Sequence, residues 1–229
     1  MTRILISLAL IFSTLLGLAQ KPFYRNFTVE DGLVSSTVYS IHQDMNGFIW
    51  FTTESGVSKF DGIFFENYGR EDGLGDNEIF SIFEDSQNRL WFFPFNGRLS
   101  YFHEGKLFNA LNDTLLDRLE INSIFEKPFE DHQGCLWIGT TRDKKIAYYS
   151  PAGKSILFKA PHKNIQIHEV GDTYIEFASK GKLLRYALEW ENELPSLGAL
   201  LEEGLAKSDA TANPSIEGYQ ISDYLVDRE

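Results

Sequence analysis

The side chains in this sequence that could do chemistry recur at regular intervals, and three aspartates are the clearest case. Asp44, Asp85 and Asp131 each follow a short apolar stretch. Carboxylates gathered about one axis could act as general acids and bases. Each of them, however, opens a four-residue turn, where an aspartate side chain accepts backbone hydrogen bonds. Recurrence at the same turn therefore favours a structural role for all three.

Aromatic residues are the other candidates for a site. Trp50, Trp91 and Trp137 could stack on a sugar ring, but their equal repetition favours a place in the core. Aromatic residues that break the repeat are better candidates for ligand binding. We therefore predict Phe93 and Phe95, which have no aromatic counterpart in the preceding repeat, as the ligand-binding residues.

No catalytic residue, metal site or cofactor site is predicted. The histidines lack metal-ligand spacing; they are His42, His103, His132, His162 and His168. The serines lack the Gly-x-Ser-x-Gly context of a nucleophile elbow, and the glycines form no phosphate-binding loop. A single cysteine, Cys135, leaves no partner for an internal disulfide.

Charge and the first residues bear on location and partners. The formal net charge is -12 with a pI near 4.9, and no Lys/Arg cluster offsets it, so nucleic-acid binding is not expected. Arg3 precedes an apolar run over residues 4–18, and Gly17 and Ala19 suit a cleavage site. We interpret residues 1–19 as a secretory signal peptide, the alternatives being an uncleaved anchor or a buried strand.

The chain is built from internal repeats of about forty residues. Shifting residues 23–56 by 41 positions onto 64–97 gives 12 identities in 34 positions without a gap. A third copy places Trp137 46 residues after Trp91, and we interpret residues 127–130 as an insertion in it. A weaker fourth copy has Tyr174 in the tryptophan position and ends at Tyr186.

Each copy is predicted to form four short antiparallel strands. In the first copy the strands cover residues 38–43, 48–53, 57–60 and 63–68, separated by turns rich in Asp, Asn and Gly. Four strands in about forty residues are typical of a β-propeller blade. Helical repeats would need a three- and four-residue apolar spacing that the turns interrupt, and a β-helix has shorter coils. The fold class predicted is all-β, with propeller blades in an incomplete ring.

The predicted domain boundaries follow from the copies. They are a strand at 22–29, blades at about 33–70, 74–109 and 120–160, and a degenerate blade at 165–186. Residues 187–229 are expected to be irregular, with helical composition over Leu197–Lys207 and the start of a truncated further blade from Ile221. These copies are too few for a ring of six to eight blades, so we expect a fragment or a truncated gene product.

The motifs of the first copy resemble the two-component regulator propeller repeat. They are Glu30–Leu33, Val38–Ile41, Asp44–Thr53 and Gly56–Gly62. The second and third copies keep the aspartate and tryptophan positions, whereas the fourth lacks the tryptophan and the Asp-x-x-Gly turn. The resemblance covers roughly residues 22–186.

The resemblance implies the exported, periplasmic sensor region of a membrane-bound histidine kinase of a two-component system. Family ligands are frequently glycans or their breakdown products, so a glycan or another small extracytoplasmic molecule is the expected partner, together with the remaining blades of a longer parent. The membrane would be reached only through a missing downstream segment. This chain is not expected to be an enzyme. The alternatives are a secreted propeller lyase or glycosidase whose catalytic residues lie elsewhere, and a secreted scaffold for protein contacts.

Overall fold

The computed structural model describes residues 25–119, 121 and 125–205. The predicted signal peptide, the first residues of the predicted strand at 22–29 and the predicted truncated blade from Ile221 lie outside the described residues. None of the helices in the described ranges has the length and apolar composition of a membrane span.

The described chain forms four antiparallel sheets of four strands, here called blades 1 to 4, with the strands of each in chain order. Blade 1 contains β1 (Val38–Gln43), β2 (Ile49–Thr53), β3 (Val57–Phe60) and β4 (Phe65–Tyr68). Blade 2 contains β5 (Ile79–Glu84), β6 (Leu90–Pro94), β7 (Ser100–His103) and β8 (Lys106–Phe108). Blade 3 contains β9 (Phe129–Glu130), β10 (Leu136–Gly139), β11 (Lys145–Ser150) and β12 (Lys154–Lys159). Blade 4 contains β13 (Gln166–Val170), β14 (Tyr174–Ser179), β15 (Lys182–Glu191) and β16 (Leu194–Leu205).

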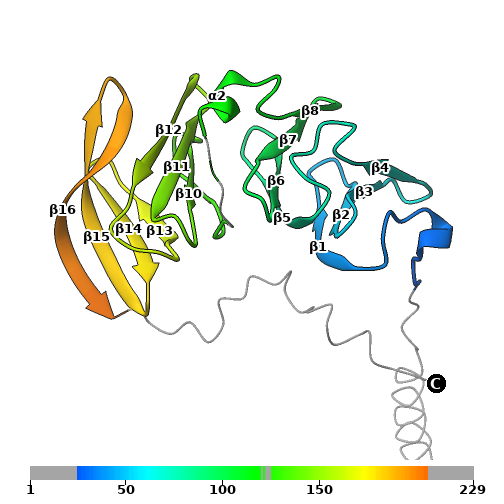
Figure 1. The fold of residues 1–229 in the computed structure, drawn as a ribbon, viewed down its shortest axis with the longest axis horizontal. Coiled ribbons are helices and arrows are strands. Elements are labelled where there is room, and N and C mark those ends of the chain that lie inside the picture. The colour runs from blue at the N-terminus through cyan, green and yellow to red at the C-terminus, as the bar shows by residue number, and fades with distance from the viewer. Residues whose placement is uncertain (1–24, 120, 122–124, 206–229) are drawn as a thin grey trace, which may run out of the picture.

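The four blades stand side by side in chain order along an arc that does not close into a ring (Figure 1). Two short helices, η1 (Val29–Asp31) and α2 (Thr114–Asp117), lie outside the sheets. The hydrophobic core lies between neighbouring blades, and Trp50, Trp91 and Trp137, all 0% exposed, each belong to a different apolar cluster. The predicted propeller architecture is confirmed.

The recurrent aspartate and tryptophan form one hydrogen-bonded unit in each of the first three blades. In blade 1, Oδ1 of Asp44 accepts the backbone N–H groups of Asn46 and Phe48, each at 2.9 Å. Its Oδ2 accepts the indole N–H of Trp50 at 2.8 Å. The same bond joins Asp85 to Trp91 and Asp131 to Trp137, each at 2.7 Å. The structural role predicted for the three aspartates is confirmed.

Neighbouring blades are also joined beside these turns. The backbone N–H of Met45, directly after the turn aspartate of blade 1, donates to Glu84 of blade 2 at 3.2 Å. The backbone N–H of Ser86, at the same position in blade 2, donates to Glu130 of blade 3 at 2.9 and 3.0 Å. Each glutamate is the last residue of the first strand in its blade, so the turn of one blade is held by the next.

The predicted insertion at residues 127–130 is wrong. Phe129 and Glu130 form β9 and pair with Trp137 and Leu136, as Phe83 and Glu84 pair with Trp91 and Leu90. The bridge between Phe125 and Thr140 corresponds to the pair Ile79 and Pro94 of blade 2, because each of its residues lies 46 positions after its counterpart. The extra residues of the third copy therefore lie before Phe125, in the connection that contains α2.

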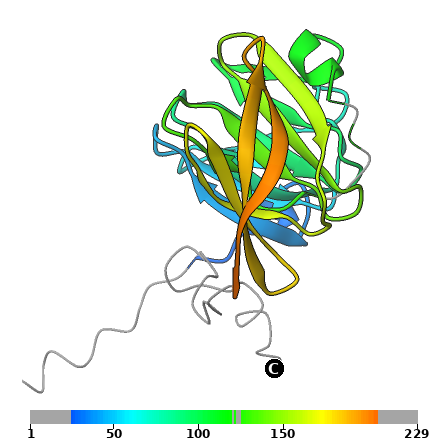
Figure 2. The same cartoon turned by 90° about the vertical axis from the view of Figure 1, so that its left-hand side faces the viewer.

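The helical interpretation of Leu197–Lys207 is wrong for its described part, and the fourth blade extends beyond residues 165–186. β15 and β16 form a long hairpin, which crosses the front of Figure 2, with a two-residue turn at Asn192 and Glu193. Both turn residues have positive φ, 52° and 63°, as tight hairpins require. Pairing with β15 along the length of β16 outweighs the local helical composition.

The predicted strand at 22–29 does not form in its described part. Residues 25–28 are irregular, and Val29 begins η1. A fourth strand without the other three strands of its sheet has no hydrogen-bonding partner, which explains the difference. Phe27 instead packs its ring on Phe60 and Phe65, at centroid distances of 4.8 and 5.4 Å, and covers part of the open face of blade 1.

We predict that Asp44→Ala destabilises the fold by about 2–4 kcal/mol, because it leaves the buried indole N–H of Trp50 and two turn amides without their acceptor. Urea unfolding followed by circular dichroism measures the effect. Asp61→Ala is the matched control, since Asp61 accepts two backbone amides in an exposed turn but contacts no tryptophan. Equal losses for the two variants would contradict the role assigned to the indole bond.

Candidate functional site

The structure separates the two phenylalanines predicted to bind ligand. Phe93 is 3% exposed and packs in the core, with its ring 5.6 Å edge-on from Phe125. Phe95 is 43% exposed and stands at the start of the β6–β7 turn. Phe95 is thus accessible to a ligand, whereas Phe93 is covered by protein.

Phe95 belongs to an exposed aromatic row with Phe80 and Tyr39. The ring of Phe95 lies 5.7 Å from that of Phe80, which stacks on Tyr39 at 4.7 Å and 23°. The guanidinium carbon of Arg142, from the β10–β11 turn, lies 5.6 Å from the Phe95 centroid. The aromatic row, defined as Tyr39, Phe80 and Phe95, therefore crosses blades 1 and 2 and ends beside blade 3.

Irregularities in strand pairing set the direction of two of these rings, those of Tyr39 and Phe80. The pairing of β1 with β2 shifts between Val38 and Ser40, and that of β5 with β6 shifts between Ile79 and Ser81. Tyr39 and Phe80 are the extra residues of these bulges, which re-aim a side chain out of the regular alternation. Sequence reasoning missed both residues as site candidates, although their shared repeat position was a usable signal.

Carboxylates accompany the aromatic row. The hydroxyl of Tyr39 donates to Oε1 of Glu78 at 3.1 Å, and Glu54 accepts the hydroxyl of Ser35 at 3.0 Å. Desolvation, followed by the hydrogen bond to Glu78, raises the pKa of Tyr39 above its ordinary value. The row offers flat apolar faces with polar groups at its edge, an arrangement suited to binding planar faces of a ligand.

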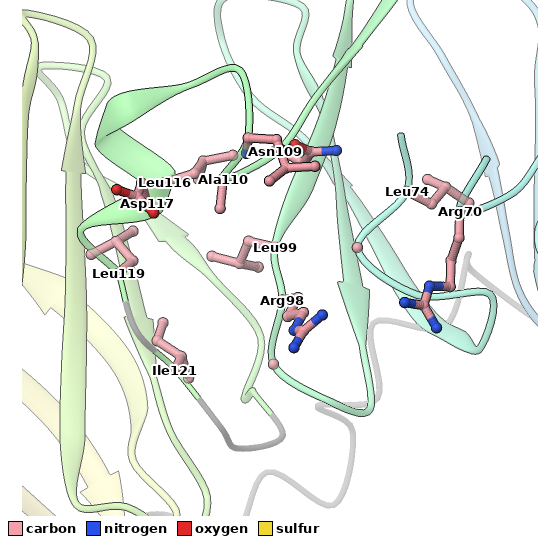
Figure 3. A pocket seen from close by; sticks show the side chains of 13 residues that line it. Arg70, Leu74, Arg98, Leu99, Asn109, Ala110, Leu116, Asp117, Leu119 and Ile121 are labelled. Carbon is pink, nitrogen blue, oxygen red and sulfur yellow. Dashed lines mark hydrogen bonds between the residues drawn. The ribbon is translucent and has the colours of Figure 1, made fainter. Parts of the chain in front are cut away.

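A cavity of about 600 Å³ opens beside the β6–β7 turn (Figure 3). Its apolar wall consists of Leu99 from blade 2 and Leu116, Leu119 and Ile121 from the α2 connection. Arg70 and Arg98 lie across from this wall. The turn and the preceding connection approach closely, since a Cβ atom on Gly75 would stand 1.7 Å from the carbonyl oxygen of Arg98.

The described residues contain no group of three or more His, Cys, Asp or Glu side chains arranged to hold a metal ion. The aromatic row and the cavity lie at the end of the sheets opposite the aspartate turns, because successive turns of an antiparallel sheet alternate between its two ends. Together they form the candidate ligand-binding end of blades 1 to 3.

The repeat motifs identify the kind of propeller. Residues 32–55 and 73–93 match the family described as two component regulator propeller. The chain carries two-component regulator propeller repeats. The matched segments contain the aspartate turn and the tryptophan of blades 1 and 2, so the regulator propeller pattern coincides with the hydrogen-bonded unit described above. No curated protein sequence matches the chain.

Solved structures share the propeller fold. The extracellular domain of a hybrid two-component system from B. thetaiotaomicron matches with a TM-score of 0.56 and 24% identity, over 71% of this chain. This chain spans 25% of that protein. A streptogramin B lyase matches with a TM-score of 0.53 and 17% identity, over 79% of this chain and 58% of the lyase. At these identities the likeness shows the fold alone.

We predict that Glu78→Gln lowers the pKa of Tyr39 but leaves it above the ordinary tyrosine value, because desolvation is the larger cause and remains. An NMR titration of ζ-carbon-labelled tyrosine, assigned with Tyr39→Phe, measures the change. Tyr174, whose pKa is raised by its hydrogen bond to Glu169, serves as the internal control and keeps its value. An unchanged Tyr39 titration would mean that the bond to Glu78 is absent in solution.

Proposed function

We propose that this regulator propeller is the ligand-sensing, non-catalytic, extracytoplasmic part of a two-component sensor, and that its ligand binds on the aromatic row. The observation that carries this proposal is that the exposed rings of Phe80 and Phe95 adjoin each other, in a fold whose other described large rings, except Phe64 and Trp190, are buried or half-buried. Soluble proteins keep adjoining apolar rings at the surface chiefly where something binds to them.

The chemistry of the row supports a glycan or a glycan breakdown product as the ligand. The apolar face of a pyranose ring packs on an aromatic ring, and hydroxyl groups at its edge pair with carboxylates and guanidinium groups. Glu78 lies beside Tyr39, and Arg142 lies beside Phe95. Neighbouring rings on blades 1 and 2 provide room for more than one sugar unit.

The proposed setting follows the sequence pattern and the family. The signal peptide proposed for residues 1–19 would export the chain to the periplasm. Further blades, a membrane helix and a histidine kinase would belong to a longer parent, in keeping with the small share of the B. thetaiotaomicron protein that this chain spans. In that arrangement a ligand on the row acts by favouring one packing of the blades over another.

We predict that Phe95→Ala and Phe80→Ala each weaken glycan binding about five- to tenfold, since loss of a stacking ring removes about 1–1.5 kcal/mol. Binding of a panel of plant, fungal and host oligosaccharides is measured by saturation-transfer NMR, followed by calorimetry on the best binder. Phe64→Ala is the matched control, because Phe64 is 72% exposed in the β3–β4 turn, away from the row.

Two outcomes would contradict this proposal. If Phe80→Ala, Phe95→Ala and Phe64→Ala all reduced binding equally, the ligand would have to bind elsewhere. Release of new reducing ends or of unsaturated products from any oligosaccharide would favour a propeller enzyme, the class to which the streptogramin B lyase belongs.

A further inference from the structure

Each junction between neighbouring blades contains aromatic rings packed around the recurrent tryptophan. Two positions beside the tryptophan are occupied by a ring or a cation in blades 1 and 2. One position is two residues before the tryptophan in the sequence, and the other pairs with the tryptophan on the third strand of the blade. These pairs are Phe48 and Lys59 in blade 1, Arg89 and Tyr101 in blade 2, and Cys135 and Tyr148 in blade 3. The first two pairs combine one ring with one cation, whereas the third has the ring without the cation.

At the junction of blades 1 and 2, Lys59 occupies the cluster. Its Nζ lies 4.2 Å from the centroid of Phe48 and 5.6 Å from the centroids of both Trp50 and Phe102. Phe102 belongs to blade 2, so the lysine contacts rings of both blades. A cation within about 6 Å of ring centroids is attracted by their negative faces.

At the junction of blades 2 and 3, Arg89 takes the same place. Its guanidinium carbon lies 5.3 Å from Trp91, 5.8 Å from Tyr101 and 5.0 Å from Tyr149 of blade 3. Its Nε donates to Oδ2 of Asp85 at 2.6 Å. The arginine is 5% exposed, so the protein itself fills this cluster with a buried, paired cation.

At the junction of blades 3 and 4, the rings are present and the cation is missing. Trp137 contacts Tyr148 at 4.8 Å and Trp190 of blade 4 at 6.2 Å, and Tyr148 contacts Trp190 at 6.1 Å. Cys135, in the position of Arg89, reaches only the hydroxyl of Tyr148, at 3.4 Å. Among the described residues, no lysine or arginine lies over any of these three rings.

A cavity of about 560 Å³ opens at this third junction. Tyr148 and Trp190, the latter 44% exposed, line it together with three carboxylates and one lysine. The carboxylates are those of Asp131, Asp172 and Glu193, and the lysine is Lys154, which is already paired with Glu193. His132, whose Nε2 lies 3.8 Å from Asp172, also lines the cavity. The cavity is therefore aromatic and acidic, and it adjoins Asp131, the equivalent of the Asp85 that holds Arg89.

We propose that the cavity between blades 3 and 4 binds an organic cation, a guanidinium group on an alkyl chain, against rings and a turn aspartate equivalent to those that hold Arg89 one junction earlier. The charged group lies against Trp190 and Tyr148 and donates to Oδ2 of Asp131, the equivalent of the Asp85 oxygen that holds Arg89. Asp131 Oδ2 already accepts the indole N–H of Trp137. In blade 2, Asp85 Oδ2 accepts both the indole N–H of Trp91 and the Nε–H of Arg89, so one oxygen can accept two donors of this kind. This site is at the aspartate-turn end of the sheets and is separate from the aromatic row.

Titration of the full chain with n-butylguanidinium tests the proposal, with n-butanol as the neutral control of equal chain length. We expect saturable quenching of tryptophan fluorescence by the guanidinium compound and none by the alcohol. A blocked Gly-Arg-Gly peptide distinguishes a free small molecule from an arginine side chain as the source of the cation. Equal responses to n-butylguanidinium and n-butanol would overturn the proposal.

Variants locate the binding. Trp190→Ala is expected to weaken binding about tenfold, the effect of losing a partly desolvated cation–π contact. Cys135→Arg supplies the missing cation internally, as in blade 2, and is expected to abolish binding; calorimetry on both variants replaces fluorescence as the readout. Phe95→Ala, in the aromatic row, is the matched control and keeps full affinity for the guanidinium compound.

The second junction gives an independent check if Cys135→Arg does not fold. Arg89→Ala empties a cluster that Trp91, Tyr101 and Tyr149 still enclose, so n-butylguanidinium is expected to raise the melting temperature of this variant more than that of the parent chain. Binding that survives Trp190→Ala unchanged, or an Arg89→Ala variant that the compound does not stabilise, would overturn the assignment of these ring clusters as cation sites.

Discussion

The hydrogen bond from a buried indole to a turn aspartate is the interaction on which the first three blades depend. The tryptophan is the largest side chain between neighbouring sheets and is fully buried, so its N–H would be costly to leave unpaired. The aspartate supplies the acceptor and uses its other oxygen to fix the turn between the first two strands. One carboxylate thereby joins the local hairpin to the packing between blades, and three such units set the spacing of the array.

Blade 4 departs from this scheme and shows what replaces it. Blade 4 lacks the Asp-x-x-Gly turn. In the shorter turn between its first two strands, the backbone N–H of Gly171 donates to the carbonyl oxygen of Tyr174. Ile175 and Phe177 face the core shared with Trp137, so Tyr174 and Glu176 lie on the opposite face. On that face Arg185 pairs with Glu176 and Glu202 and lies over the ring of Tyr174. The blade therefore presents a charged surface where the other blades present a tryptophan.

Successive turns of each sheet alternate between its two ends, and the two ends have different roles. The aspartate turns and the glutamates that join successive blades occupy one end, where a change of side chain would disturb packing. The opposite end is formed by the connections between blades and by turns such as β6–β7, whose residues differ between copies. Phe80 and Phe95 are exposed at this variable end. The cavity between blades 3 and 4 lies at the packed end, beside the exposed ring of Trp190.

The sequence by itself determined the number of strands per copy, their turns and the burial of the tryptophans, because these depend on residue types repeated at a fixed spacing. It also separated Phe93 and Phe95 from the repeat, but only the end of β6 at Pro94, which leaves Phe95 in the turn, decided which ring is covered. The strand β16, the true place of the extra residues before Phe125 and the row of Tyr39 with Phe80 follow from strand register. The tertiary structure alone decided these features, since register and contacts between blades depend on partners distant in the chain, which no local spacing specifies.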